Sequence, residues 1–486
     1  MPNRLNTLAG LFAVWMLGAV GALALWGSYS PDSYGYWLLG DALAHGRGYA
    51  PQALRDFWLP SESWSSRSFP PLWPVLLAGL SALKGGLESA AVLNLGVAAG
   101  LAALCALWAH KAKSWVAFAV FGLVLIDARF IEEVVAARAM PIAFLMGMTG
   151  LLLIQSSRLP SFFMAGIALG LAMLARFDML ALAAAAGIGL WVTSASQSRL
   201  KYVSTFLGGL LLALGPWVLR NWVEFHSPLM SDNTVTALSL YRGNAAQAYW
   251  DTLPEFSGVQ WLSQRAQYLV IGLASLFGKF SWSIPTACAI GLGVAAWPKL
   301  EQPQQRLLLS VGLATTLGLC LLALTPYTDE RYFLIYGLYA GITLGSLGLE
   351  KRLPSSRQST VLLVSVLLVC GLSTTLAGYH KVRTTAQSWS FATKGQTAAA
   401  WVKSLALPAG RIGADNAEAL AYYVGPGYLT VQRPNNLTPQ DEAYWRWARR
   451  FKLDYVLLNA SEVPVAQAAQ VIATSPEHNL ALLRPL

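Results

Sequence analysis

The chain has 486 residues, of which 55% are hydrophobic and 12% are charged, with 19 tryptophans and a formal net charge of +10. Soluble domains have about 45–50% apolar and about 25% charged residues, so this composition indicates an integral membrane protein. The positive charge does not indicate nucleic-acid binding, because no compact run of Lys and Arg interleaved with aromatic residues lies outside the apolar segments. The four cysteines lie in apolar runs without CxxC spacing, which indicates neither a zinc site nor a disulfide framework.

The first apolar segment covers residues 5–27 and contains no charged residue. Its length matches the about 20 apolar residues that are needed to cross the hydrocarbon core of a bilayer. A signal peptide has a shorter apolar core and a small-residue cleavage site, and no such site precedes Asp32. We therefore expect a retained first membrane span.

The segment after this span, SPDSYGYWLLGDALAHGRGY, begins at Ser30 and is rich in Tyr and Trp. In a helix, Tyr36, Leu39 and Leu43 would share one face, whereas Asp41 and His45 would lie opposite. This pattern predicts a short amphipathic helix in the membrane interface, where Trp and Tyr are frequent. Such a helix would hold Asp32 at the boundary between lipid and water.

Long apolar runs recur along the chain and are bounded by polar or basic residues. They cover about residues 88–109, 114–126, 139–154, 161–175, 179–193, 202–219, 282–297, 307–324, 332–349 and 360–377. With the first span they predict about eleven transmembrane helices. The segment PLWPVLLAGLSALKGG from Pro71 is short and opens with prolines, so we expect it to lie in the interface or to re-enter the membrane.

This assignment satisfies the positive-inside rule. It places four basic clusters on the cytoplasmic side, namely Lys111/Lys113, Arg199/Lys201, Lys299/Arg306 and Lys351/Arg352/Arg357. The outer side then receives Asp32, RFIEEVVAAR from Arg129, RFD from Arg176, RNWVEFHSP from Arg220 and YTDERY from Tyr327. Each of these segments could be a solvated helix end, but their accumulation on one face favours a site there.

The last part of the chain is less apolar and alternates helix-like with strand-like segments. GQTAAAWVKSLA and TPQDEAYWRWARRF read as helices, and RIGAD, DYVLLN and LALLR read as strands. We therefore expect a polytopic α-helical membrane domain over residues 1–378 and a small extracytoplasmic α/β domain over residues 379–486. The membrane domain would have a first outer loop with interfacial helices at residues 28–70 and a further outer loop at residues 220–265.

Several motifs follow one another in an order typical of one family. After the first span and Asp32 come YWLLGDALAHGRGY, RSFPPLWPVLLAGL, PWVLRNWVEFHSPL and DERYFLIYGLY. Over about residues 5–378 this order resembles the GT-C glycosyltransferases, in particular the protein mannosyltransferase and aminoarabinose transferase branch. The resemblance implies an inverting hexosyl- or pentosyltransferase of a bacterial-type cytoplasmic membrane. It would move a sugar from a polyprenyl-phosphate carrier to lipid A, a glycan or a protein on the periplasmic face.

The resemblance also implies roles for single residues. Asp32 stands where the family has its catalytic base, and the structural alternative on sequence alone is a helix-end or turn aspartate after Pro31. A second outer acid is usual in the family, but Ala139 occupies its place here, so the role would pass to Glu132 or Glu133 or be absent. Adjacent residues of a helix project about 100° apart, so we expect at most one of these glutamates to face the site.

Arginines suit the phosphate leaving group because the planar guanidinium can donate two parallel hydrogen bonds. The candidates for donor binding are Arg67, Arg176, Arg220, Asn221, Arg331 and Tyr332. Pairing with Glu224, Asp329 or Glu330 is the structural alternative for these arginines. Further candidates for lining the site are Tyr36, His45, Asp178, Asp329 and Glu330. Some relatives bind a divalent metal, but no His/Glu spacing here requires one, and no cofactor is expected.

Other functions remain open at this stage. A transporter or flippase of lipid-linked sugars would place its charged or broken-helix sites near the bilayer midplane and often shows repeated halves, unlike this sequence. A relative without catalytic activity could serve as a binding subunit, since Ala139 replaces the expected acid. Ligases that transfer preassembled glycans from a pyrophosphate carrier share the outward-facing site.

Overall fold

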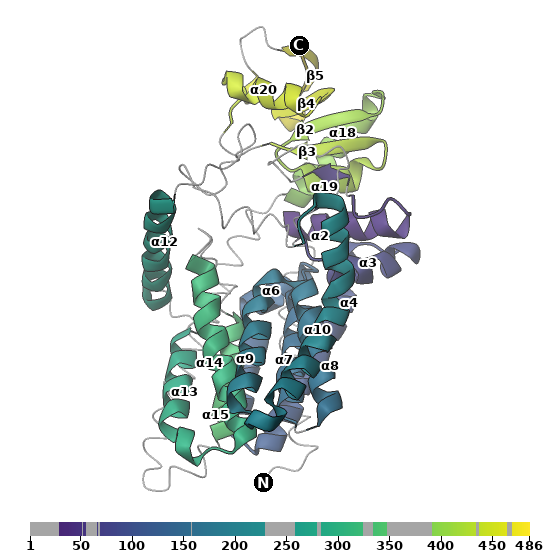
Figure 1. The fold of residues 1–486 in the computed structure, drawn as a ribbon. Coiled ribbons are helices and arrows are strands. Elements are labelled where there is room, and N and C mark those ends of the chain that lie inside the picture. The colour runs from purple at the N-terminus through teal and green to yellow at the C-terminus, as the bar shows by residue number, and fades with distance from the viewer. Residues whose placement is uncertain are drawn as a thin grey trace.

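The computed structural model describes residues 29–50, 52–54, 66, 69–156, 158–228, 258–278, 283–323, 334–347, 391–433, 437–463 and 469–486. A bundle of helices carries a small α/β domain at one end, and α2 (Pro31–Ala44) and α3 (Leu72–Ala82) lie between the two (Figure 1). The bundle places the start of α2 and the turn after α6 (Ala128–Val135) at the end that faces the α/β domain. The fold therefore brings the first outer segment and the segment around Glu132 to the same end.

The apolar runs of the sequence form helices at the expected places. These helices are α4 (Leu87–Ala112), α5 (Trp115–Leu125), α7 (Met140–Ile154), α8 (Leu159–Ala175), α9 (Leu180–Thr193), α10 (Ser196–Phe225), α13 (Ser283–Ala296), α14 (Gln302–Ala323) and α15 (Leu334–Leu347). Their bounds agree with the expected spans to within about six residues at each end, as the weak definition of helix ends allows. The first span and the run at 360–377 lie outside the described residues.

Length and composition identify fewer membrane-crossing helices than the sequence predicts. In the described part of the chain, Leu87–Ala112 and Ser196–Phe225 are long and apolar enough to cross a membrane. Ala128–Val135 and Met140–Ile154 form a third span if the pair, bent by 111°, is counted as one. These helices are those of a membrane protein, while the expected total of about eleven spans stays a prediction.

Helices α8 and α10 approach each other closely through glycines. A Cβ on Gly166 would overlap the carbonyl oxygen of Phe206, and a Cβ on Gly209 would overlap that of Phe163. Small residues at facing positions let two helix backbones come together, which replaces the hydrophobic driving force that is absent between helices in lipid. This contact fixes α10, which carries Arg220 and Asn221 one turn before its end.

The helix α2 differs from the interfacial amphipathic helix that we expected. Every residue from 33 to 40 is buried, including Tyr36 and Leu39 on the expected apolar face and Trp37 and Leu38 beside it. The helix packs along α3 and under α19 (Ala417–Val424), so neighbouring elements of the protein cover it on several sides. The amphipathic expectation is wrong for this part of α2 because its aromatic residues pack against protein.

The expected outer loop at residues 220–265 is shorter than predicted at both of its ends. Helix α10 continues to Phe225, and a further helix, α12 (Gly258–Gly278), begins before residue 265 and packs against α14. The polar residues Gln264, Arg265 and Gln267 interrupt the apolar pattern of this segment, which hid the helix from a hydropathy reading.

The α/β domain is built on a six-stranded sheet with the order β1-β3-β2-β4-β6-β5. The strands are β1 (Ala53–Leu54), β2 (Gly410–Ala414), β3 (Tyr428–Gln432), β4 (Tyr455–Asn459), β5 (Ala469–Ser475) and β6 (Leu480–Pro485). β1, β3, β2 and β4 run parallel, whereas β6 is antiparallel to β4 and β5. The expected strands and helices are present, and β3, β5 and α19 were missed.

Helices cover both faces of this sheet. α20 (Glu442–Arg450) packs on one face through Tyr444 and Trp447, which lie against Val456 of β4. α18 (Phe391–Ser404) and α19 pack on the other face, where Leu457 of β4 is buried. Burial on both faces explains why β4 is a continuous apolar run rather than an alternating one.

The first outer loop contributes β1 to the edge of this sheet. Ala53 is paired with Thr430 and Leu54 with Val431, and the Thr430 amide donates a hydrogen bond of 2.8 Å to the Gln52 carbonyl. An edge strand offers unpaired backbone groups that an added strand can satisfy. The sheet therefore includes residues of the first outer loop, and the expected boundary at residue 379 lies outside the described residues and stays a prediction.

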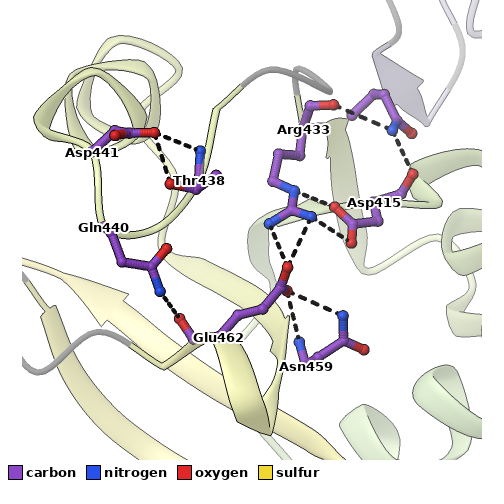
Figure 2. A network of polar contacts seen from close by, with 8 residues as sticks. Asp415, Arg433, Thr438, Gln440, Asp441, Asn459 and Glu462 are labelled. Carbon is purple, nitrogen blue, oxygen red and sulfur yellow. Dashed lines mark hydrogen bonds and ion pairs between the residues drawn. The ribbon is translucent and has the colours of Figure 1, made fainter.

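A polar network joins the carboxyl ends of the parallel strands β2, β3 and β4 (Figure 2). Arg433, which follows β3, forms an ion pair with Asp415 after β2, with 2.9 Å between its NH2 and Asp415 Oδ2. Arg433 also lies 3.4 Å from Glu462 Oε1, and Glu462 in turn accepts hydrogen bonds from Asn459 of β4. Burial raises the pKa of Asp415, Arg433 lowers it and Glu462 raises it further. Arg433 is thus the cation that holds the ends of three strands.

Replacement of Arg433 by Met is expected to weaken the sheet by about 1–2 kcal/mol, since both carboxylates are partly exposed and lose a charged partner. Hydrogen–deuterium exchange of peptides covering β2, β3 and β4 measures this loss. Arg449→Met is the matched control, because Arg449 pairs with Glu442 in a contact where the side chains are 46% and 67% exposed. Equal exchange in the two variants would contradict the role of Arg433.

Candidate active site

Asp32 lies in the first turn of α2, which begins with a capping box. Ser30 is the N-cap, the amide of Ser33 donates to Ser30 Oγ at 3.4 Å, and the amide of Ser30 donates to Ser33 Oγ at 3.0 Å. Pro31 fits the first helical position, where no amide hydrogen is needed. Ser30 and Ser33 are buried, whereas Asp32 is partly exposed. An acidic residue in the first turn of a helix interacts favourably with the helix dipole.

The turn between α6 and α7 brings two acids and an arginine next to α2. Arg138 donates from NH1 to Glu133 Oε1 at 2.5 Å and from NH2 to Glu132 Oε1 at 3.2 Å. Its Nε donates to Ser30 Oγ at 2.9 Å, two residues before Asp32 in the chain. Arg138 thus connects both glutamates to the N-cap of α2, and we call Ser30, Glu132, Glu133 and Arg138 the acid–arginine cluster. Asp32 follows Ser30 by two residues in the chain.

Glu132 and Glu133 both contact the guanidinium of Arg138, because its fork reaches two carboxylates that project in different directions. The expectation that at most one of them faces the site stays a prediction. Glu133 is buried, whereas the side chain of Glu132 is 19% exposed. Ala139, which stands where the family has an acid, is the buried N-cap residue of α7 and presents no polar side chain.

Neighbouring helices hold the backbone of this turn. Asn94 of α4 donates from Nδ2 to the carbonyl oxygens of Glu133, Val134 and Arg138 at 2.9–3.1 Å. Trp73 of α3 donates from Nε1 to the carbonyl oxygen of Ala137 at 2.7 Å. Ala137 has a φ of 53°, in the left-handed region, and this conformation redirects the chain by 111° from α6 into α7. Buried donors thus fix the position of Arg138.

The α/β domain contacts α2 close to Asp32. Tyr34 Oη lies 3.3 Å from Tyr423 Oη of α19, and the ring of Tyr34 packs against Tyr422 and Tyr423. Tyr29 packs edge-on against Tyr34 at 6.2 Å between ring centroids. Burial raises the pKa of Tyr29 and that of Tyr34, so both phenols stay protonated. The domain therefore lies on the first turns of the helix that carries Asp32.

Arg220 and Asn221 lie at the end of α10 and hold the first outer loop. Arg220 donates to the carbonyl oxygen of Ser66 at 2.9 Å and to Asn221 Oδ1 at 2.9 Å. Its guanidinium lies over the rings of Tyr49, Trp217 and Phe225 at 4.6–5.3 Å from their centroids. Arg220 therefore links α10 to the first outer loop. Phosphate binding by Arg220 stays a prediction.

Aromatic residues of the first outer loop connect Arg220 to α2. Tyr49 Oη donates to the carbonyl oxygen of Phe69 at 2.9 Å, and the Phe69 ring lies 4.4 Å from the ring of Tyr36. Gly35 allows this approach, since a Cβ there would come within 2.7 Å of the Phe69 ring. Tyr36 is therefore buried against Phe69, and this contact helps to hold α2 in place.

Other predicted residues lie apart from the acid–arginine cluster or outside the described residues. Arg176 pairs with Asp178 at 2.8 Å, at the junction of α8 and α9. His45 contacts Asp41 at the other end of α2, about 20 Å along the helix from Asp32. Arg67, Asp329, Glu330, Arg331 and Tyr332 lie outside the described residues, so their roles stay predictions.

The sequence reasoning missed Arg138, Ser30, Asn94 and Trp73. Arg138 was within the quoted segment RFIEEVVAAR, five and six residues after the two glutamates. That spacing was a usable signal, because a cation near two acids in an apolar setting requires pairing. Asn94 inside the apolar run of α4 was a second signal, since a buried amide requires partners.

Glu132 and Glu133 do not fit a divalent metal in this arrangement. A metal prefers carboxylate oxygens that are free of a competing cation, and here the guanidinium of Arg138 lies against both carboxylates. Among the described residues, no group of three His, Cys, Asp or Glu side chains could hold a metal ion. Both carboxylates therefore share the single positive charge of Arg138.

The fold resembles solved structures of the oligosaccharyltransferase from Archaeoglobus fulgidus. The apo structure has a TM-score of 0.52 and 12% identity over 93% of this chain and 70% of that chain. The complex with Zn and sulfate has a TM-score of 0.54 and 11% identity over 92% and 68%. The complex of this enzyme, AglB, with an inhibitory peptide and a dolichol-phosphate has a TM-score of 0.50 and 10% identity over 93% and 69%.

These similarities define the fold. The chain shares the fold of this oligosaccharyltransferase, and a helical part with a small sheet domain agrees with the fold that the motifs predicted. No protein-family model matches the sequence, and no curated protein matches it.

Proposed function

We propose that the protein is an inverting glycosyltransferase that moves a sugar from a polyprenyl-phosphate carrier to an acceptor on the outer face of a bacterial-type cytoplasmic membrane. The observation that carries this proposal is the position of Asp32. It lies in the first turn of α2, two residues after Ser30, which accepts a hydrogen bond from the buried Arg138, and Tyr34 of the same helix contacts Tyr423 of the α/β domain. Asp32 itself is partly exposed.

In the proposed reaction Asp32 is the general base. Asp32 accepts the proton of an acceptor hydroxyl or amide while the oxygen or nitrogen of the acceptor attacks C1 of the sugar from the face opposite the phosphate. The C1–oxygen bond to the phosphate breaks, the electron pair leaves with the polyprenyl phosphate, and the anomeric configuration inverts. Arginines stabilise the negative charge on the leaving group, for which Arg67, Arg176, Arg220 and Arg331 are the candidates.

The donor and the acceptor follow from chemical class. AglB has been solved with a dolichol-phosphate and a peptide, which supports a polyprenyl-phosphate donor and a glycan, lipid or protein acceptor for this chain. Transfer of a preassembled glycan is the second candidate, because the similar structures are oligosaccharyltransferases. The sugar and the acceptor are to be identified by experiment.

A transporter or flippase is the alternative from another class. Transporters hold their substrates near the bilayer midplane in broken helices. Here Glu132 and Glu133 pair with Arg138, Arg138 bonds the N-cap of α2, and α2 contacts α19 of the α/β domain, which supports chemistry at the outer boundary. A binding subunit without activity would not need Asp32 as a base.

Proteoliposomes that contain the purified protein distinguish these functions. They are supplied with the polyprenyl-phosphate sugars in a lipid extract and with the membrane fraction of a strain that lacks the protein. A glycosyltransferase releases polyprenyl phosphate and attaches the sugar to an acceptor. Movement of intact lipid-linked sugar between leaflets without product would instead support a flippase, and binding without either event would support an inactive relative.

A further inference from the structure

Arg138 is buried, with 5% of its surface exposed, although arginines are almost never buried unless they are paired. Its guanidinium points three ways, to Glu133 and Glu132 of α6 and to Ser30 of α2. A lysine could not make this set of contacts, because an ammonium is a point charge on a flexible stem. The residue therefore connects two elements through a planar fork.

The charges of the cluster explain why a cation is needed there. Glu133 is 1% exposed, and a buried carboxylate without a partner costs several kcal/mol. Nature can supply the partner as a divalent cation or as a side chain. In this chain the partner is the side chain of Arg138. Asn94 of α4 donates to the carbonyl oxygen of Arg138, and Trp73 of α3 donates to that of Ala137, the residue before it.

The hydrogen bond from Arg138 to Ser30 also holds the start of α2. Ser30 Oγ accepts from Arg138 Nε and from the amide of Ser33, while its own hydrogen is placed to bond Ser33 Oγ at 3.0 Å. These bonds use the full capacity of the hydroxyl. Movement of Arg138 would therefore disturb the capping box, and with it the turn that carries Asp32.

We propose that Arg138 is a positioning residue that holds the turn of Asp32 against the two glutamates and replaces a divalent cation between them. This inference rests on the proposed transfer reaction. It predicts transfer that does not require a divalent metal. It also predicts that Arg138 acts on the rate of the chemical step rather than on binding of the lipid donor.

The test uses the full-length protein in proteoliposomes with the lipid extract and membrane fraction described above. Native protein is expected to keep its transfer rate in EDTA. Arg138→Ala is expected to lower kcat by roughly a hundredfold with KM for the lipid donor unchanged, since a displaced base loses reaction geometry. Added ethylguanidinium should restore part of that rate. Arg158→Ala, which removes an exposed arginine before α8, is the matched control and should behave as native.

Three results would overturn the proposal while leaving the glycosyltransferase function intact. They are loss of native transfer in EDTA with recovery in Mn²⁺ or Mg²⁺, a native rate in folded Arg138→Ala, and a fall confined to KM. If Arg138→Ala does not fold, Arg138→Lys serves instead: it keeps the charge but not the fork, so a native rate in it also overturns the proposal. Absence of transfer by the native protein would instead refute the proposed function itself.

Discussion

Asp32→Asn is expected to abolish sugar transfer by the purified protein while leaving its fold and its donor binding unchanged. The amide has the size of the carboxylate but cannot accept the acceptor's proton, and general-base catalysis contributes about a hundredfold to ten-thousandfold in rate. The capping box of Ser30 and Ser33 does not involve the Asp32 side chain, so the helix start should persist. The transfer rate in proteoliposomes, together with the melting temperature, measures both expectations.

Asp41→Asn provides a matched control on the same helix. Asp41 accepts a hydrogen bond from Ser81 at 2.7 Å and pairs with Arg47, and it lies at the other end of α2 from Asp32. An amide oxygen can still accept from Ser81, and the pair with Arg47 is partly exposed and contributes little. A native rate in Asp32→Asn, or an equal loss in both variants, would refute the role of Asp32 as base.

Gly209→Ala is expected to lower the melting temperature of the protein in detergent. The added Cβ would overlap the carbonyl oxygen of Phe163, a backbone atom that cannot rotate away, so α8 and α10 would have to separate. Overpacking of this kind costs about 1–3 kcal/mol. Separation would also shift the last turn of α10, and we therefore expect reduced transfer through displacement of Arg220 from Ser66.

The adjacent residue provides the control for this prediction. A Cβ on Gly208 would have Phe163 Cε2 as its nearest neighbour at 3.9 Å, an ordinary contact. Gly208→Ala should therefore melt at or above the native temperature, because alanine favours a helix. Equal melting of the two variants would show that the close approach of α8 and α10 does not limit stability.

Most helices of the fold could be predicted from the sequence because apolar runs of sufficient length leave few alternatives. α12 escaped because Gln264 and Arg265 lower its apparent hydropathy. α2 was expected as a helix but not as a covered one, since its burial depends on α19, which is more than 370 residues away in the chain. β1 could not be predicted, because two residues become a strand only through pairing with β3.

The site was predictable only in part. Asp32 and the acidic pair were identified from their chemical type and from the order of motifs. The bond between Arg138 and the N-cap of α2 was not predictable, because it depends on the 111° bend between α6 and α7 and on the reach of one arginine. It joins residues 108 positions apart, and hydropathy carries no information about such a contact.

We propose that Asp32 promotes transfer of a sugar from a polyprenyl-phosphate carrier on the outer face. This role is tested by mass spectrometry of polyprenyl-phosphate sugars and surface glycans in cells that carry native protein or Asp32→Asn at matched membrane levels. We predict that one polyprenyl monophosphate sugar accumulates in the variant and that one surface glycan or glycosylated acceptor loses the same sugar. Unchanged profiles in both would contradict the claim.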